Sequence, residues 1–303
     1  MDVKEENDLN EKLKTLFNRQ IEFWPLAATN YANLNKVVSH ELNIDNVRLL
    51  VQYNPARKNS TLARVDDLSI KNRPCFLCAE NLPQEQEGII VNQYRLLVNP
   101  FPIFPQHFSI TSQLHAKQAI AASFRDLLFF AQQLHSFVLF YNGPNCGASA
   151  PDHLHFQACS RGYIPLIEDF EKFSRDNTKI ISRTDGCRLF AVAGMLRSVF
   201  IIESDNINEA EVAFLNLYRK WITAPDVEPM MNILVSFEND KWRIFVLPRK
   251  VFRPDCFFAE GENQVMISPA AVEMGGVFIT AREEDFDKVN ALLIRQIYAQ
   301  VSL

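Results

Sequence analysis

The chain has 303 residues, 48% hydrophobic and 22% charged, which is enough apolar material for one large core or two smaller ones. A formal net charge of -5 provides no broad cationic surface, so long nucleic acids and anionic membranes are not expected as partners. The N-terminus is charged where a signal peptide would be apolar, and no stretch approaches the roughly 20 apolar residues of a membrane span, which predicts a cytoplasmic protein.

Helical and strand patterns alternate along the first half of the chain. Apolar residues recur at helical spacing from 9 to 21, and this helix is expected to end before Pro25, whose ring would clash with a continuing helix. A second helix is predicted over 116–138, before a strand (VLFYN), a turn-rich loop (NGPNCGASAPD) and another strand (HLHFQAC). Runs of Val, Ile, Leu and aromatic residues predict earlier strands at 46–53, 89–98 and 107–111.

The second half shows the same mixture of elements. A helix is predicted at 208–222 and another at 283–300, with a hairpin between them that runs from MNILVSF through a turn at 238–240 to KWRIFVLP. Both halves are therefore expected to be α+β. The pattern fits two independent domains and two related halves that share one sheet equally well, and no short repeat indicates a solenoid or propeller.

Two histidines and a glutamine alternate at His153, His155 and Gln157. Alternate residues of a strand project from the same face, so the two imidazoles and the amide are expected to share one surface. A neutral imidazole can attack the α-phosphorus of a nucleotide and leave a nucleotidyl-imidazole for a second acceptor. In isolation, the same pattern is more typical of a metal site or of satisfied polar side chains in a core.

The loop before these residues is suited to binding phosphate. Gly147 allows backbone N–H groups to approach phosphate oxygens closely, and Ser149 adds a hydroxyl. Gln157 could donate a hydrogen bond to the same phosphate during transfer. These neighbours make a nucleotide-transfer site the better interpretation of the alternating histidines.

Cys75 and Cys78 are the only tight pair among the six cysteines. Their C-x-x-C spacing lets two thiolates bind one tetrahedral zinc ion, but zinc needs about four ligands and there is no second pair. Histidines would have to supply the others. From the motif alone, a redox pair or a coincidence fits equally well, whereas a disulfide scaffold is not expected in a reducing compartment.

The segment CGASAPDHLHFQ resembles the active site of the histidine-triad (HIT) superfamily, in the branch whose third histidine is replaced by glutamine. This branch contains galactose-1-phosphate uridylyltransferases, diadenosine tetraphosphate phosphorylases and GDP-L-galactose phosphorylases. The resemblance implies an α+β, HIT-like fold in which His155 is the nucleophile and Gln157 the assisting amide. The family serine usually lies three residues before the first histidine, where this chain has Ala150, so the resemblance leaves the phosphate contact of Ser149 open.

The segment RPCFLCAENLP is similar to the CFLCxxN segment of zinc-containing uridylyltransferases. The similarity implies a structural zinc ion bound by Cys75, Cys78, His153 and one further histidine. His107 and His115 are the candidates, and the superfamily pattern, with its zinc-binding residue at the strand end, favours His115. Four protein ligands leave no open position for water, so this zinc would support the loops around the site.

Two segments of the second half, NILVSFENDKWRIFVLPRK and SPAAVEMGGVFITAREEDF, resemble the C-terminal part of GDP-L-galactose phosphorylases and, more loosely, of dinucleotide phosphorylases. The resemblance then covers most of residues 46–287. It makes Arg249 and Lys250 candidates for binding phosphates of the nucleotide or acceptor, although a charged pair at a strand end is as often a solvated edge. The weaker candidates are Arg57, Lys58 and Arg64.

The resemblance implies two HIT-like halves, a catalytic half with the zinc site at 1–200 and a half without a nucleophile at 201–303. The expected reaction is ping-pong: a sugar nucleotide or dinucleoside polyphosphate transfers its nucleoside monophosphate to His155, and phosphate or a sugar phosphate then accepts it. The alternatives are a HIT-type hydrolase and a non-catalytic nucleotide-binding scaffold. The sequence leaves open the base, the sugar, and whether the protein is a monomer or a homodimer.

Overall fold

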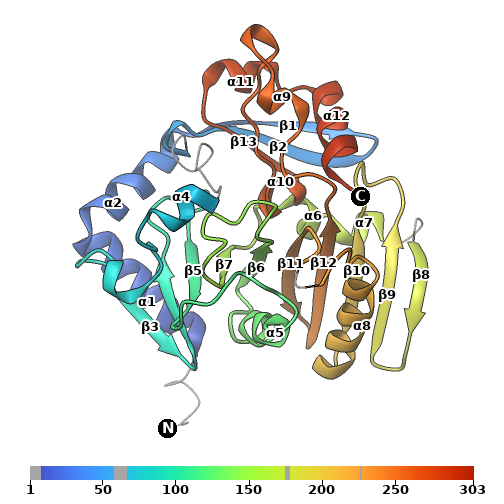
Figure 1. The fold of residues 1–303 in the computed structure, drawn as a ribbon, viewed down its shortest axis with the longest axis horizontal. Helices are drawn as coiled ribbons and strands as arrows, with labels where there is room; N and C mark the ends of the chain where they lie inside the picture. Colours follow the sequence, from blue (N-terminus) through green and yellow to red (C-terminus); the bar gives the residue numbers. More distant parts are fainter. Residues whose placement is uncertain (1–7, 58–66, 175–177, 226) are drawn as a thin grey trace.

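The computed structural model describes residues 8–57, 67–174, 178–225 and 227–303 (Figure 1). Lys58 and Arg64, two of the weaker phosphate candidates, lie outside these ranges. Within them, the strands form one ten-stranded sheet, all of whose pairings are antiparallel, and one three-stranded sheet. The small sheet contains β1 (Val38–Ile44), β2 (Val47–Tyr53) and β13 (Val277–Thr280).

The large sheet is built from two successive sets of five strands. The first set comprises β3 (Gly88–Val91), β4 (Tyr94–Val98), β5 (His107–Ser112), β6 (Phe137–Asn142) and β7 (His155–Ser160). The second set comprises β8 (Thr178–Arg183), β9 (Cys187–Val192), β10 (Phe200–Ser204), β11 (Met231–Glu238) and β12 (Lys241–Pro248).

Both sets have the same topology. Read from the edge of the sheet inward, their orders are β3-β4-β5-β7-β6 and β8-β9-β10-β12-β11. In each set a helix connects the third strand to the fourth, α5 (Phe124–Gln133) in the first and α8 (Ile207–Arg219) in the second. β6 and β11 pair antiparallel at the centre, with Asn142 opposite Asn232. The prediction of an α+β fold with two related halves is confirmed, and the halves share one sheet.

The two faces of the large sheet pack against different elements. One face is covered by α1 (Leu9–Phe23), α2 (Pro25–Ala32), α5 and α8, and Phe156 of β7 is buried in this core. The other face packs against the small sheet and the short helices around it, where Cys159 is buried. Since side chains alternate along a strand, His155 and Gln157 of β7 point to this second face.

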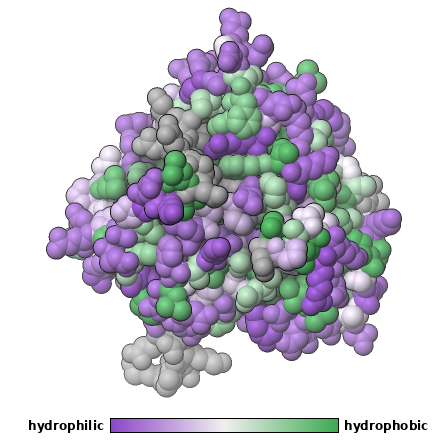
Figure 2. All heavy atoms as spheres, in the orientation of Figure 1, coloured by the Kyte–Doolittle hydropathy of each residue, from purple (hydrophilic) through white to green (hydrophobic). Residues whose placement is uncertain are grey.

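The remaining helices, most of them short, largely surround the small sheet (Figure 1). They are α4 (Asp67–Lys71), α6 (Pro165–Glu168), α7 (Phe170–Phe173), α9 (Asp255–Phe258), α10 (Ala271–Met274), α11 (Glu283–Lys288) and α12 (Ala291–Val301), with 3-10 turns at Asn33–Lys36, Pro55–Arg57, Ala79–Asn81 and Gly261–Asn263. None of the described helices has the length and apolar character that a membrane crossing requires. The surface in this view is a mixture of hydrophilic and scattered apolar side chains (Figure 2).

Several predicted elements differ from the structure for local reasons. The predicted strand 89–98 is a hairpin, since the chain turns at Asn92, which has φ of 53°. The predicted C-terminal helix is divided in two because Asn290 caps the second part by accepting from the N–H of Leu293. The predicted helix 116–138 begins only at 124, since residues 116–118 instead hydrogen-bond to the loop before β7.

Candidate active site and metal centre

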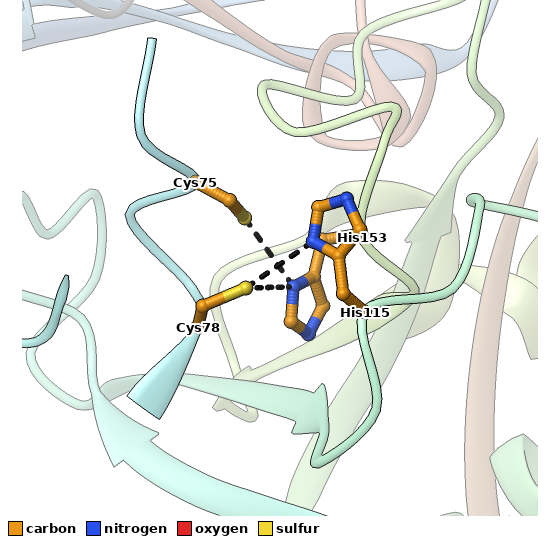
Figure 3. Close-up of side chains that lie close together, drawn as sticks. All are labelled: Cys75, Cys78, His115 and His153. Carbon is orange, nitrogen blue, oxygen red and sulfur yellow. Dashed lines mark hydrogen bonds between the residues drawn. The ribbon is translucent and has the colours of Figure 1, made fainter. Parts of the chain in front are cut away.

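Four side chains of the types that bind metals meet beside the start of β7 (Figure 3). They are Cys75, Cys78, His115 and His153, and their ligand atoms all lie within 4.8 Å of one another. The Sγ of Cys75 lies 3.3 Å from Nδ1 of His153. The Sγ of Cys78 lies 3.2 Å from Nδ1 of His115. His115 therefore joins the cluster, whereas His107, the other candidate considered from the sequence, lies elsewhere.

Both imidazoles turn Nδ1 toward the thiols, and Nε2 of His153 has a hydrogen-bond partner of its own. The Nε2 of His153 lies 2.8 Å from the carbonyl oxygen of Ser112, which can only accept, so Nε2 carries a proton. The Nε2 of His115 faces Oδ2 of Asp152 at 4.0 Å, and Oδ1 of Asp152 accepts from Arg73 at 2.8 Å. A carbonyl partner such as that of Ser112 orients a histidine ligand in metal sites, whereas 4.0 Å is too long for a hydrogen bond from His115 to Asp152.

The thiols and imidazoles also influence each other's protonation. Burial raises the pKa of Cys75, but the hydrogen bond and charge of His153, the main chain of Leu77 and the hydrogen bond to Cys78 together outweigh burial, and the pKa falls to about 6. Burial and the neighbouring Cys75 raise the pKa of Cys78 to about 11. Thiolates are the metal-binding form, and a bound cation would replace the thiol protons. Two sulfur and two nitrogen donors at these distances could hold one metal ion, and the set fits tetrahedral coordination.

His155 is the first residue of β7 and is 4% exposed. Its Nδ1 lies 2.8 Å from the carbonyl oxygen of His153, so Nδ1 carries the proton and Nε2 keeps a free lone pair. Burial lowers the pKa of His155 to about 4, which keeps the imidazole neutral at physiological pH. Its tautomer and charge are therefore those that nucleophilic attack through Nε2 requires.

Gln157 is oriented by His107, a contact that was not predicted. The main-chain N–H of Ile103 donates to Nδ1 of His107 at 3.3 Å, so the proton of this imidazole is on Nε2. That Nε2 lies 2.8 Å from Oε1 of Gln157 and donates to it. Burial lowers the pKa of His107 to about 3 and keeps it neutral. The NH2 group of Gln157 is thereby turned away from His107 and can donate to a ligand.

The loop between β6 and β7 carries the predicted phosphate contacts Gly147 and Ser149. Gly147 has φ of 110°, and a Cβ at this position would lie 2.5 Å from Cβ of Ala270. Only glycine fits this close approach without strain. Ser149 is exposed whereas Ala150 is buried, so Ser149 has the hydroxyl that a ligand could reach in this loop.

Arg249 and Lys250 differ sharply in their surroundings. All five N–H groups of Arg249 donate within the protein, at distances between 2.6 and 3.2 Å. Their acceptors are the side chain of Asn232 and the carbonyl oxygens of Pro269, Val301, Val251 and Phe252. A phosphate contact by Arg249 would require at least one of these bonds to break. Lys250 is exposed.

Arg57 lies at the end of the 3-10 turn after β2 and donates to the carbonyl oxygen of Phe101 at 2.7 Å. Burial lowers its pKa to about 10, and the charge of Glu273 opposes this shift. The positive charge of Arg57 in turn contributes to the low pKa of His107. Arg57 is therefore the one weaker phosphate candidate that can be related to the site in the described residues.

Comparison with known proteins divides the chain into two matched parts. Residues 16–160 match a family model described as a domain of unknown function, DUF4922. Residues 172–303 match the model described as "GDPGP1-like, C-terminal domain". No curated protein sequence matches the chain.

The solved structures that match include the yeast Ap4A phosphorylase Apa2. Its crystal structure has 15% sequence identity and a TM-score of 0.64, with 98% of this chain and 95% of that chain covered. The same enzyme in complex with Ap4A has 16% identity and a TM-score of 0.64, with 96% and 97% covered. Its complex with AMP has 16% identity and a TM-score of 0.59, with 96% of both chains covered.

The chain thus has the α+β fold of the yeast Ap4A (diadenosine tetraphosphate) phosphorylase Apa2, which agrees with the fold expected from the histidine motif. Within that fold, residues 172–303 are the part that matches the GDPGP1-like C-terminal domain model. The boundary expected at residue 200 stays a prediction. The start of the second family model at 172 and of β8 at Thr178 favours an earlier boundary.

Proposed function

We propose that this protein is a nucleotide phosphorylase or nucleotidyltransferase that forms a covalent nucleotidyl intermediate on His155. The observation that carries the proposal is the buried, neutral imidazole whose Nδ1–H donates to the carbonyl oxygen of His153, which leaves Nε2 unprotonated. The similarity to a yeast enzyme solved with AMP and with Ap4A supports a nucleotide substrate, either a dinucleoside polyphosphate or a sugar nucleotide.

In the first half-reaction, the lone pair on Nε2 of His155 attacks the α-phosphorus. The new N–P bond replaces the bond between the phosphorus and its bridging oxygen. The rest of the substrate, a nucleoside polyphosphate or a sugar phosphate, leaves as an anion that keeps this oxygen. The hydrogen bond from Nδ1 to His153 stabilises the positive charge that develops on the imidazole. Gln157, with its NH2 turned away from His107, donates to a non-bridging oxygen of the transferred group.

In the second half-reaction, an oxygen of inorganic phosphate or of a sugar phosphate attacks the same phosphorus. The N–P bond breaks, the electron pair returns to Nε2, and neutral His155 is regenerated. Water in place of the phosphate would make the protein a hydrolase. The second half of the chain cannot repeat this chemistry, because all six histidines lie at or before residue 155.

We assign the metal cluster to a structural zinc ion held by Cys75, Cys78, His115 and His153. When bound, zinc would cross-link the segment before β3 to the segments that flank β5 and β7. All four positions would be filled by the protein, so the ion would offer no site for substrate. Because His153 also accepts from Nδ1–H of His155 through its carbonyl oxygen, the ligand set supports the nucleophile directly.

The phosphates of the substrate are proposed to contact the loop between β6 and β7, through backbone N–H groups near Gly147 and the hydroxyl of Ser149. Lys250 is exposed and could contribute a point charge. Arg249 fits a structural role better than the phosphate contact predicted for it, since each of its N–H groups already has a protein acceptor.

The test is intact-protein mass after brief incubation with UDP-sugars, GDP-sugars, ATP and diadenosine polyphosphates. We expect one substrate to add the mass of a nucleoside monophosphate, which phosphate or a sugar phosphate then removes. The adduct should be absent from His155→Ala and present in His135→Ala, since His135 is an exposed histidine outside the motif and the metal cluster. Turnover with water alone would favour the hydrolase. The absence of both labelling and turnover would favour the non-catalytic binding scaffold.

A further inference from the structure

Gln118 binds both main-chain polar groups of His155. It is 3% exposed, and its Oε1 accepts a hydrogen bond from the N–H of His155 at 2.8 Å. Its Nε2 donates to the carbonyl oxygen of His155 at 3.0 Å and to that of Asn142 at 2.9 Å. One amide therefore satisfies the peptide groups of the nucleophile and ties them to the end of β6.

This contact replaces strand pairing where the sheet ends. The pairing of β6 with β7 extends only as far as Phe140 opposite Gln157, so His155 lies beyond the paired part of these two strands. The amide of Gln118 lies between the carbonyl oxygens of Asn142 and His155 and bridges them. The main chain of His155 is thus fixed on this side by a side chain, whereas β5 pairs with it on the other side through Thr111.

The segment that carries Gln118 is itself anchored at several points. The N–H of Leu154 donates to the carbonyl oxygen of Ala116 at 2.6 Å, and the N–H of Gln118 donates to that of Pro151 at 3.1 Å. The carboxylate of Glu228 accepts from the N–H of Ile120 at 2.6 Å. Glu228 lies between α8 and β11, so the second half of the chain helps to hold this segment.

A buried network also extends from Asn142 into the second half. Oδ1 of Asn142 accepts from Nδ2 of Asn232 at 2.9 Å and from the N–H of Ala271 at 2.8 Å. Oδ1 of Asn232 accepts in turn from Arg249 at 2.6 Å. The backbone against which Gln118 positions His155 is therefore braced by Arg249, which gives this buried cation a role that needs no phosphate.

We infer that Gln118 is a positioning residue for the nucleophile, which holds the main chain of His155 so that Nε2 faces the α-phosphorus. The imidazole is oriented by a hydrogen bond to the carbonyl oxygen of His153, so its direction depends on the main chain of residues 153–155. A shift of that main chain would redirect Nε2 without removing any group that contacts the nucleotide. The inference rests on the proposed function for its kinetic consequence, but its structural consequence can be measured separately.

The experiment compares Gln118→Met with a matched control, Gln20→Met. Gln20 is also buried, at 1% exposed, and its amide makes two main-chain hydrogen bonds, with Glu85 and Glu87, against three made by Gln118. Both variants lose a buried amide of similar size, so they should lose similar thermal stability. At saturating nucleotide, the single-turnover rate of labelling should fall on the order of 100-fold in Gln118→Met and stay near the native rate in Gln20→Met. The nucleotide Kd and the metal content should be unchanged in both.

Nitrogen-15 NMR of the histidine side chains supplies the readout that does not need turnover. The Nδ1–H signal of His155, protected by its bond to His153, should be present in the native protein and in Gln20→Met and lost or broadened in Gln118→Met. If the native protein is not labelled by any nucleotide, the proposed function fails, while this NMR comparison still decides the positioning role. Equal labelling rates and an intact Nδ1–H signal in Gln118→Met would overturn the inference. Should that variant not fold, Gln118→Asn, which keeps the amide on a shorter side chain, is expected to show the same losses.

Discussion

The rate of labelling of His155 should stay nearly constant as the pH falls from about 8 to about 5, because burial lowers the pKa of this imidazole to about 4. With a pKa of about 4, roughly 90% of the imidazole is neutral at about pH 5, whereas an unperturbed histidine would be only about 3% neutral there. Burial thus predicts an approximately 30-fold advantage in the reactive form at about pH 5.

The assay is the single-turnover rate of nucleotide transfer at saturating dinucleoside polyphosphate, which has no terminal phosphate monoester to titrate near neutral pH. Metal content must be measured at each pH, because protons compete with a metal for thiolates and imidazoles. The prediction concerns the pH range in which the metal stays bound. A rate that is half-maximal at about pH 6.5, with metal still present, would mean that His155 is solvated and would refute the argument from burial.

Three further predictions concern the surrounding residues. Cys75→Ser should lose the bound metal and lower Tm, as judged by metal analysis and calorimetry, whereas Cys146→Ser, at a buried cysteine outside the cluster, should retain one ion per chain. His107→Phe should slow labelling about 10- to 100-fold by freeing the amide of Gln157, with little change in metal content, and an unchanged rate would show that this orientation is unimportant. Phe156→Ala, in the core behind the site, should lower the free energy of unfolding by about 3–5 kcal/mol in urea titration, and a loss below about 1 kcal/mol would contradict its full burial.

Local patterns in the sequence were sufficient for the features that depend on neighbouring residues. The alternation of side chains along a strand predicted that His155 and Gln157 lie on one face, opposite Phe156, and the structure has this arrangement. The C-x-x-C spacing indicated two ligands that one ion could share, and Cys75 and Cys78 do lie in one cluster. The helical and alternating spacings of apolar residues also predicted an α+β fold. Each spacing shows which face of a helix or strand is buried, whichever element covers that face.

Only the tertiary structure decided which distant residues join these motifs. It brings His115 to the cysteines and His107 to Gln157, although the two histidines lie in one short stretch of sequence. It also buries Gln118 against His155 and surrounds Arg249 with acceptors. A polar residue carries no sequence signal of its hydrogen-bond partner when that partner lies on another strand or in the other half of the chain. The strand register and the junction of β6 with β11 supply these partners, and burial makes each of them necessary.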